Sequence, residues 1–193
     1  MLQKIKSYIK FLWNSKNEHG VHSPFVFDLV TKCFYDKTKY PKYSLLKNNS
    51  KRARLFFRII RYFKPKTILE IGNPTELDTN LFSSEITSFE DFQKNIHSNN
   101  DTSFDFRLST FDFIFFNKNQ SKKSTLDYFE LLLPTVTNDS VWICNDIHKS
   151  TENENTWDII KKHPKVKVTI DTFHFGMVFF RAEQEKEHFV IRV

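Results

Sequence analysis

The sequence is organised around residues 66–92, in which a strand, a glycine, a helix and a second strand follow one another. The apolar run at residues 67–71 predicts a buried parallel strand. Gly72 follows at once, where the chain leaves the sheet and where a backbone can approach a ligand closely. Residues 86–89 predict the second strand, which ends at Glu90. An acidic residue about 20 residues beyond a strand–turn–helix is suited to hold a ribose diol.

Similar patterns along the chain predict an α/β fold. Apolar runs predict further strands at residues 111–116, 140–144, 166–171 and 177–181, with a short edge strand in the tail 189–193. Amphipathic patterns predict helices at residues 2–13, 25–34, 51–63, 126–133 and 152–162. A chain of 193 residues holds one such domain with a real core and is too short for two full ones.

Two features of the sequence bear on the compartment. No apolar run approaches the roughly 20 residues that a membrane span needs, and the stretch 11–13 is too short for a signal peptide. Cys33 and Cys144 have no motif spacing, which is typical of a reducing compartment. We therefore expect a cytoplasmic protein in which both cysteines belong to the core or the strands.

The charge is distributed unevenly. Residues 1–66 carry 16 Lys and Arg against three acidic residues, a net charge of +13, whereas the remainder carries 13 against 20, a net charge of −7. The basic third is suited to an anionic or protein partner, including nucleic acid or a membrane surface, or else it lies beside the chain's own acidic half. On helix 51–63, one stripe of basic residues is suited to bind phosphates or is simply a solvated face. Its members, the candidate anion-binding residues, are Lys51, Arg54, Arg58 and Arg61.

The first helix and the turn that follows it each allow two interpretations. Leu2, Ile5, Ile9 and Leu12 fall at helical spacing, so helix 2–13 either packs on its own domain through them or lies on an anionic lipid surface. His19 and His22, in the turn that precedes helix 25–34, are spaced as metal ligands, but a structural turn is the simpler interpretation.

Residues 66–92 resemble the cofactor motif of the class I S-adenosylmethionine (SAM)-dependent methyltransferases, written E-x-G-x-x-x-G. Glu70 and Gly72 match this motif, whereas Glu76 stands at the second glycine. Glu90 matches the acidic residue that holds the cofactor ribose in that family. Residues 19–30, 125–136, 145–150 and 168–181 further resemble small bacterial O-methyltransferase-like proteins.

The resemblance implies a Rossmann-like methyltransferase fold with a mostly parallel central sheet and an antiparallel last strand. Only residues 104–109 remain for the third strand of that sheet, so we expect the sheet to be truncated there, where the adenine is normally covered. Residues 1–64 are expected to form a basic helical segment that packs on the α/β domain of residues 65–193.

The resemblance also implies the site residues. SAM would lie against Glu70, Gly72, Asn73, Glu90 and Asn117, although the bulk and charge of Glu76 disfavour its methionine end. The metal ligands of cation-dependent relatives correspond to Asn117, Asn145 and Asp146, and only the last is a carboxylate. Lys118 adds a positive charge beside them, so a divalent metal at Asn145 and Asp146 would be held weakly at best.

The chemistry of methyl transfer assigns roles to two further positions. Asp146 and His148 are the candidate catalytic residues, which would orient or deprotonate the methyl acceptor. A hydrogen-bonded structural role for His148 at a strand end is the alternative.

Three functions are consistent with these observations. The first is a methyltransferase-fold protein whose activity is weak or lost, a pseudoenzyme with a binding or regulatory role. The second is an active SAM-dependent O- or N-methyltransferase. The third is a nucleic-acid-binding module that uses the basic N-terminal layer. We favour the first, because the cofactor motif, the adenine side and the metal positions all depart from the family pattern.

Overall fold

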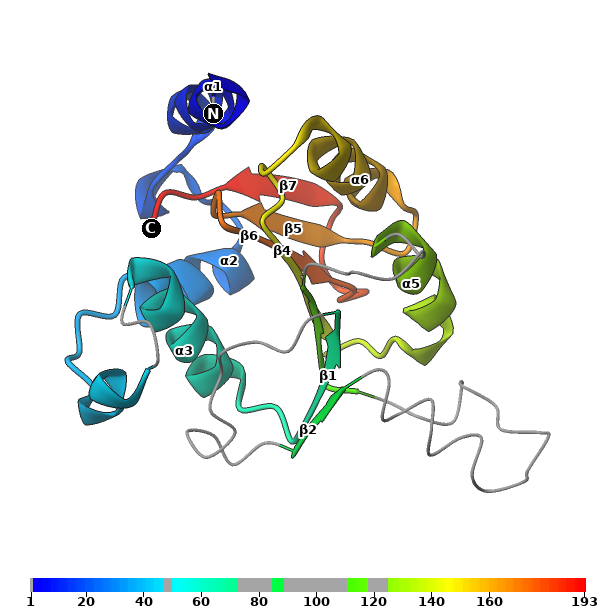
Figure 1. Ribbon diagram of the computed structural model, residues 1–193, viewed down its shortest axis with the longest axis horizontal. Helices are drawn as coiled ribbons and strands as arrows, with labels where there is room; N and C mark the ends of the chain where they lie inside the picture. The colour runs from blue at the N-terminus through cyan, green and yellow to red at the C-terminus, as the bar shows by residue number, and fades with distance from the viewer. Residues whose placement is uncertain (1, 47–49, 73–84, 89–110, 118–124) are drawn as a thin grey trace.

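A computed structural model describes residues 2–46, 50–72, 85–88, 111–117 and 125–193 (Figure 1). Within these ranges, seven strands form one sheet in the order β2-β1-β3-β4-β6-β5-β7. The strands are β1 (Thr67–Ile71), β2 (Glu85–Ser88), β3 (Phe113–Phe116), β4 (Val141–Asn145), β5 (Val168–Asp171), β6 (Phe175–Phe179) and β7 (Glu187–Val190). The α-helices are α1 (Leu2–Asn14), α2 (Pro24–Leu29), α3 (Lys51–Phe63), α5 (Thr125–Leu132) and α6 (Thr151–Lys162).

The strand directions confirm the predicted mostly parallel sheet. Strand β1 pairs in parallel with β2 and β3, and β3 pairs in parallel with β4. Strand β6 runs antiparallel to both of its neighbours, β4 and β5, and the tail adds β7 parallel to β5 at the edge. The chain leaves β1 in one direction to form β2 and returns to the other side of β1 to form β3, which creates a topological switch point between β1 and β3. The predicted third strand, residues 104–109, lies outside the described residues.

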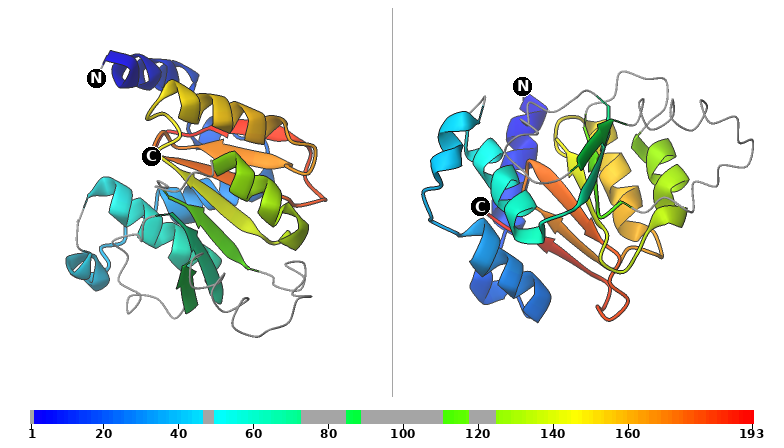
Figure 2. Two further views of the ribbon diagram at one scale, coloured as in Figure 1. Left: turned by 45° about the vertical axis from the view of Figure 1, so that its right-hand side comes forward. Right: turned by 90° about the horizontal axis from the view of Figure 1, so that it is seen from below.

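Two layers of helices cover the sheet, because alternate residues of each buried strand point to opposite faces (Figures 1 and 2). On one face, α2 and α3 pack on the sheet through Leu29, Phe56 and Ile59, which contact strand residues such as Phe113. The other face is covered by α5 and α6. The basic N-terminal segment therefore shares one hydrophobic core with the strands.

Most predicted elements form within a residue or two of their expected ends. Helix α3 and strand β1 have the predicted bounds. The expected helix 25–34 is α2 followed by a single π-helical segment, Val30–Phe34, and begins where Ser23 accepts a hydrogen bond from the Val26 N–H at 3.4 Å. Strand β6 begins at Phe175, earlier than predicted, because residues 172–174 alone make the turn from β5.

Helix α1 differs from the expectation in the side chains that it buries. Of the two interpretations of its apolar stripe, packing on the domain does not hold for Ile5 and Ile9, which are 50% and 52% exposed. Ser7 and Phe11 are buried instead, and the Phe11 ring lies 5.4 Å from that of Phe173. Helix α1 therefore packs on the domain through Ser7 and Phe11, and Ile5 and Ile9 point outward.

Candidate functional site

The carboxyl ends of three parallel strands bring the candidate residues together. Gly72 follows β1, Asn117 follows β3, and Asn145 ends β4. The Asn117 N–H donates to the Ile71 carbonyl oxygen at 2.8 Å, which ties the end of β3 to the end of β1. In open α/β sheets, ligands bind at this edge, beside the topological switch point.

The guanidinium of Arg52, from helix α3, contacts the residues at this edge. Arg52 Nη2 donates to Asn145 Oδ1 at 2.5 Å, and Arg52 Nη1 donates to Asp146 Oδ1 at 3.1 Å. Asn145 Nδ2 in turn donates to Asn117 Oδ1 at 2.8 Å. The guanidinium also lies 5.4 Å from the centre of the Phe175 ring, a favourable cation–π contact. Arg52 therefore links Asn145 and Asp146 directly, and Asn117 through Asn145, which are the three positions predicted from the family resemblance.

Asp146 is held by its backbone as well as by its side chain. Its φ of 54° lies in the left-handed region, which Asp tolerates better than most residues. The Asp146 N–H donates to the His174 carbonyl oxygen at 2.8 Å, and its own carbonyl oxygen accepts from Asn153 Nδ2 at 2.9 Å. The turn after β4 is thus fixed by the turn before β6 and by the first turn of α6.

The second candidate catalytic residue, His148, is held between two carboxylates. Its Nδ1 lies 2.8 Å from Glu154 Oε1 on α6, and its Nε2 lies 2.7 Å from Asp171 Oδ2 at the end of β5. Phe173 stacks on the imidazole with 5.3 Å between ring centres and an interplanar angle of 15°. Both ring nitrogens are therefore engaged, and the ring is fixed in place.

These contacts set the protonation of His148. Burial lowers its pKa, but the hydrogen bonds and charges of Asp171 and then of Glu154 outweigh burial, so the pKa lies above its ordinary value of 6.5. Burial raises the pKa of Glu154, and its contacts with His148, Ser7 and Lys10 outweigh that effect and hold the pKa below its ordinary value. A general base needs a ring nitrogen that can take up a proton. The two carboxylates favour the protonated form of His148, and its catalytic role stays a prediction.

A small cavity opens beside these side chains. Its volume is about 160 Å³, which is below the roughly 300–1,000 Å³ of typical small-molecule sites. It is lined by Lys4, Arg52, Asp146, His148, Lys149, Phe173 and His174. Burial, and then the charges of Arg52 and Lys4, lower the pKa of His174. The lining therefore carries three cations, Lys4, Arg52 and Lys149, and one carboxylate, Asp146.

The donor set does not fit a divalent metal. Among the described residues, no group of three or more His, Cys, Asp and Glu side chains is placed to hold one. Asn117 and Asn145 are neutral, and the carboxylate of Asp146 already faces the Arg52 cation. Mg²⁺ needs carboxylates in near-octahedral geometry. The guanidinium stands where a cation would have to bind.

The predicted cofactor residues are only partly described. Glu70 is buried on β1, and Gly72 has a φ of 95°, which a residue with a side chain adopts only with strain. Asn73 and Glu90 lie outside the described residues, as does Glu76. The roles of all these residues in cofactor binding stay predictions.

The predicted anion-binding stripe of α3 contacts its own chain. Arg58 donates to the carbonyl oxygens of Cys33 and Phe34 at 3.0 Å and 2.9 Å. The guanidinium groups of Arg61 and Arg54 lie 4.6 Å and 5.6 Å from the Tyr40 and Tyr43 ring centres. The remaining member, Lys51, is exposed. Anion binding by these four residues stays a prediction.

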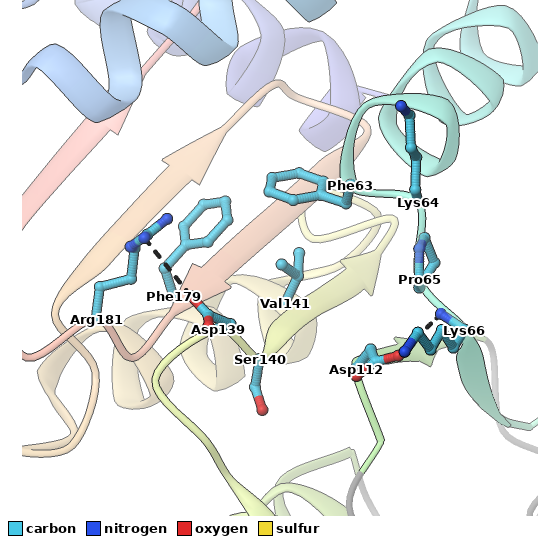
Figure 3. Close-up of a pocket in the computed structure, with 10 residues that line it drawn as sticks. All are labelled: Phe63, Lys64, Pro65, Lys66, Asp112, Asp139, Ser140, Val141, Phe179 and Arg181. Atoms are coloured by element: carbon cyan, nitrogen blue, oxygen red, sulfur yellow. Dashed lines mark hydrogen bonds and ion pairs between the residues drawn. The ribbon is translucent and has the colours of Figure 1, made fainter.

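A larger cavity, of about 410 Å³, lies at the opposite edge of the sheet, where β1, β3 and β4 begin (Figure 3). Asp112 Oδ2 accepts from the Lys66 N–H at 2.8 Å, and Arg181 Nη2 lies 3.6 Å from Asp139 Oδ1. This edge is the one that α/β folds do not ordinarily use for ligands. We place the candidate site at the carboxyl edge for that reason.

Comparison with known proteins gives structural matches only. No protein-family model matches the sequence, and no curated protein matches it. The SAH-bound methyltransferase PaMTH1 of Podospora anserina matches 91% of this chain and 94% of its own, with a TM-score of 0.49 and 12% identity. A proposed caffeoyl-CoA O-methyltransferase from Staphylococcus aureus matches 93% of this chain and 100% of its own, with a TM-score of 0.45 and 14% identity.

A third structure, the O-methyltransferase from Bacillus cereus in complex with SAH, covers 81% of this chain and 88% of its own, with a TM-score of 0.40 and 12% identity. These TM-scores are below 0.5, so the fold assignment rests on the strand order and the antiparallel β6. This strand order agrees with the predicted Rossmann-like α/β fold. No helix among the described residues is long and apolar enough to cross a bilayer.

Sequence reasoning missed three residues of the site. Arg52 is one of five basic residues in α3, and no local pattern singles it out. Asp171 is the last residue of the predicted strand 166–171 and lies at the same edge as Asp146, so its place at the end of a strand was an available signal. Glu154, in the first turn of α6, follows the common preference for acidic residues at helix N-termini.

Proposed function

We propose that this chain is a SAM-dependent methyltransferase-like protein whose transfer activity is weak or lost, and that it acts by binding a partner. The observation that carries the proposal is the Arg52 guanidinium on Asn145 Oδ1 and Asp146 Oδ1, at 2.5 Å and 3.1 Å. A built-in cation takes the place of the metal that activates the acceptor in cation-dependent relatives. Under this proposal, no metal ion would activate an acceptor beside Asn145 and Asp146.

The state of the two candidate catalytic residues supports the same conclusion. SAM supplies an activated methyl group, so the protein has to align an acceptor and receive a proton. The Asp146 carboxylate is already engaged by the Arg52 guanidinium at 3.1 Å. His148 has both ring nitrogens on carboxylates and a raised pKa. Neither group is arranged as a base toward the cavity.

An active, metal-independent methyltransferase is the second candidate. Gly72, with a φ of 95° directly after β1, supports it, because a backbone without a side chain lets a cofactor approach closely. Glu70 and Gly72 would then hold SAM, together with Asn73, Glu90 and Asn117. Under this alternative, Asp146 would align the acceptor, and Arg52 would hold the Asp146 carboxylate in place.

Calorimetric titration with SAM and with S-adenosylhomocysteine, with and without Mg²⁺, separates the candidates. We expect weak or undetectable binding of either compound and no effect of Mg²⁺. Micromolar binding together with methyl transfer would overturn the proposal in favour of the active enzyme. In that case Glu90→Ala should abolish binding, while Glu185→Ala, on an exposed turn, should leave it unchanged.

A further inference from the structure

Helix α1 presents two different faces. Its inner face packs on the domain through buried Ser7 and Phe11, and the ring of Tyr8 lies 4.8 Å from that of Phe173. Its outer face carries Ile5, Ile9 and Trp13, which are 50%, 52% and 87% exposed. These three residues recur every four positions and so form one stripe along the helix. Figures 1 and 2 show α1 at the periphery of the molecule, beyond α6, with no described element on its outer side.

The charge of α1 indicates what covers this stripe. The helix contains Lys4, Lys6 and Lys10 and no acidic residue. All three lysines are exposed. A helix with Ile and Trp on one side and lysines beside them is suited to the surface of an anionic bilayer, where Trp favours the headgroup level. Lys4 lines the cavity on the inner side, so Lys6 and Lys10 are the lysines beside the stripe, and each lysine near such a surface contributes about 1 kcal/mol of attraction.

Two other occupants fit the helix less well. A second copy would bring an identical helix with three lysines against the first, so like charges would face one another. Three side chains also cover far less than the roughly 800 Å² per partner of a standard protein interface. Nucleic acid is bound chiefly by cationic groups on phosphates and by stacking, which leaves Ile5 and Ile9 without a role.

We propose that α1 docks this protein on an anionic lipid bilayer, with Ile5, Ile9 and Trp13 at the boundary between headgroups and acyl chains. The helix has 13 residues and is about 20 Å long. Because the stripe runs along the helix, α1 lies in the plane of the surface when the stripe is buried. Its inner face covers the candidate site, because Lys4 lines the 160 Å³ cavity and Phe11 contacts Phe173. Docking therefore places that cavity beside the bilayer. The proposal does not depend on cofactor binding.

The three tryptophans provide a specific reporter. Trp13 is 87% exposed, whereas Trp142 and Trp157 are 0% and 3% exposed. Transfer of Trp13 into an interface should shift the fluorescence emission to shorter wavelength, while the two buried tryptophans contribute a constant signal. The probes are vesicles of phosphatidylcholine mixed with phosphatidylglycerol, compared with vesicles of pure phosphatidylcholine. We expect the shift with the anionic vesicles only, and we expect Trp13→Phe to lose it.

Vesicle co-sedimentation compares two matched variants. Ile9→Asp places a charge on the stripe, and Ile159→Asp places the same charge on α6, where the isoleucine is 49% exposed. We expect Ile9→Asp to reduce binding to anionic vesicles by at least about tenfold and Ile159→Asp to leave it near the wild-type value. Circular dichroism and thermal unfolding establish that both variants are folded.

Several results would overturn the proposal. The proposal fails if Ile9→Asp binds vesicles as well as the wild type does. It also fails if anionic vesicles cause no emission shift. A dimer that forms without lipid and that Ile9→Asp dissociates would assign the stripe to a second copy instead. Salt-sensitive binding to RNA that Ile9→Asp does not affect, without any vesicle binding, would assign α1 to nucleic acid.

Discussion

Arg52 and Asp146, which are 94 positions apart in the sequence, form a hydrogen-bonded ion pair at 3.1 Å between helix α3 and the turn after β4. The pair joins the basic N-terminal segment to the acidic remainder of the chain. One positive charge of the basic segment is thereby paired with one negative charge of the remainder. The same guanidinium reaches Asn145, so one side chain stabilises the whole carboxyl edge of β4.

Removal of this guanidinium should weaken the fold. The Arg52→Met variant leaves the Asp146 carboxylate, whose side chain is 26% exposed, without its nearest cation. We expect the free energy of unfolding in urea to fall by about 1–2 kcal/mol. Lys51→Met, which removes one charge from the exposed neighbouring position, should change it by less than about 0.5 kcal/mol. Equal effects of the two substitutions would contradict the assigned role of Arg52.

The stability contribution of His148 should depend on pH. Because its pKa is raised above 6.5 in the folded protein, the contribution is fully present below pH 6.5 and is lost as the pH rises through the folded-state value. At about pH 6, His148→Gln should be roughly 1–2 kcal/mol less stable than the wild type, and the difference should shrink toward about pH 9. Urea unfolding over a pH series measures it.

The stability contribution of His174 should depend on pH in the opposite direction. Burial, and then Arg52 and Lys4, lower its pKa, so its contribution is present above pH 6.5 and is lost as the pH falls. The stability of His174→Gln relative to the wild type should therefore rise toward low pH. Parallel curves for the two histidine variants would contradict both assignments.

Gly176 should not tolerate a side chain. A Cβ at this position in β6 would lie 2.7 Å from Cζ3 of the buried Trp157 ring. Gly176→Ala should therefore lower the free energy of unfolding by about 1–3 kcal/mol. At Gly20 the nearest atom is Cδ of the flexible Lys16 side chain, at 2.9 Å, so Gly20→Ala should remain within about 1 kcal/mol of the wild type. Thermal unfolding of the two variants tests the difference.

Asp112 should stabilise the starts of β1 and β3. Its Oδ2 accepts from the N–H groups of Lys66 and Thr67 at 2.8 Å and 3.3 Å (Figure 3). Asp112→Ala should lower the free energy of unfolding by about 1 kcal/mol. Asp139, in the same cavity, has a side chain that is 85% exposed, so Asp139→Ala should have an effect below about 0.5 kcal/mol. A loss for Asp139→Ala as large as that for Asp112→Ala would be inconsistent with these contacts.

Long periodic segments made the fold predictable from the sequence. The apolar run of β1 and the two-sided pattern of α3 gave their bounds directly, because burial on one or both faces dictates residue spacing. The pattern of α1 gave a helix but not its packing face. Hydrophobic periodicity identifies an apolar side, and only the position of Phe173 decides that Phe11 is the residue that fills it.

Some residues of the candidate site could be named from the sequence, and others could not. Asn117, Asn145, Asp146 and His148 could be named in advance from the family resemblance of the segments that follow the predicted strands. Their partners could not, since Arg52, Glu154 and Asp171 come from three other elements, far apart in sequence.

The sequence by itself therefore determined the sheet, its helices and the residues at its carboxyl edge, because these follow from local patterns of burial. Only the tertiary structure decided that a guanidinium stands among the expected metal positions and that His148 lies between two carboxylates. Hydrogen bonds and charges act over a few ångströms, and which groups come that close depends on how the whole chain packs.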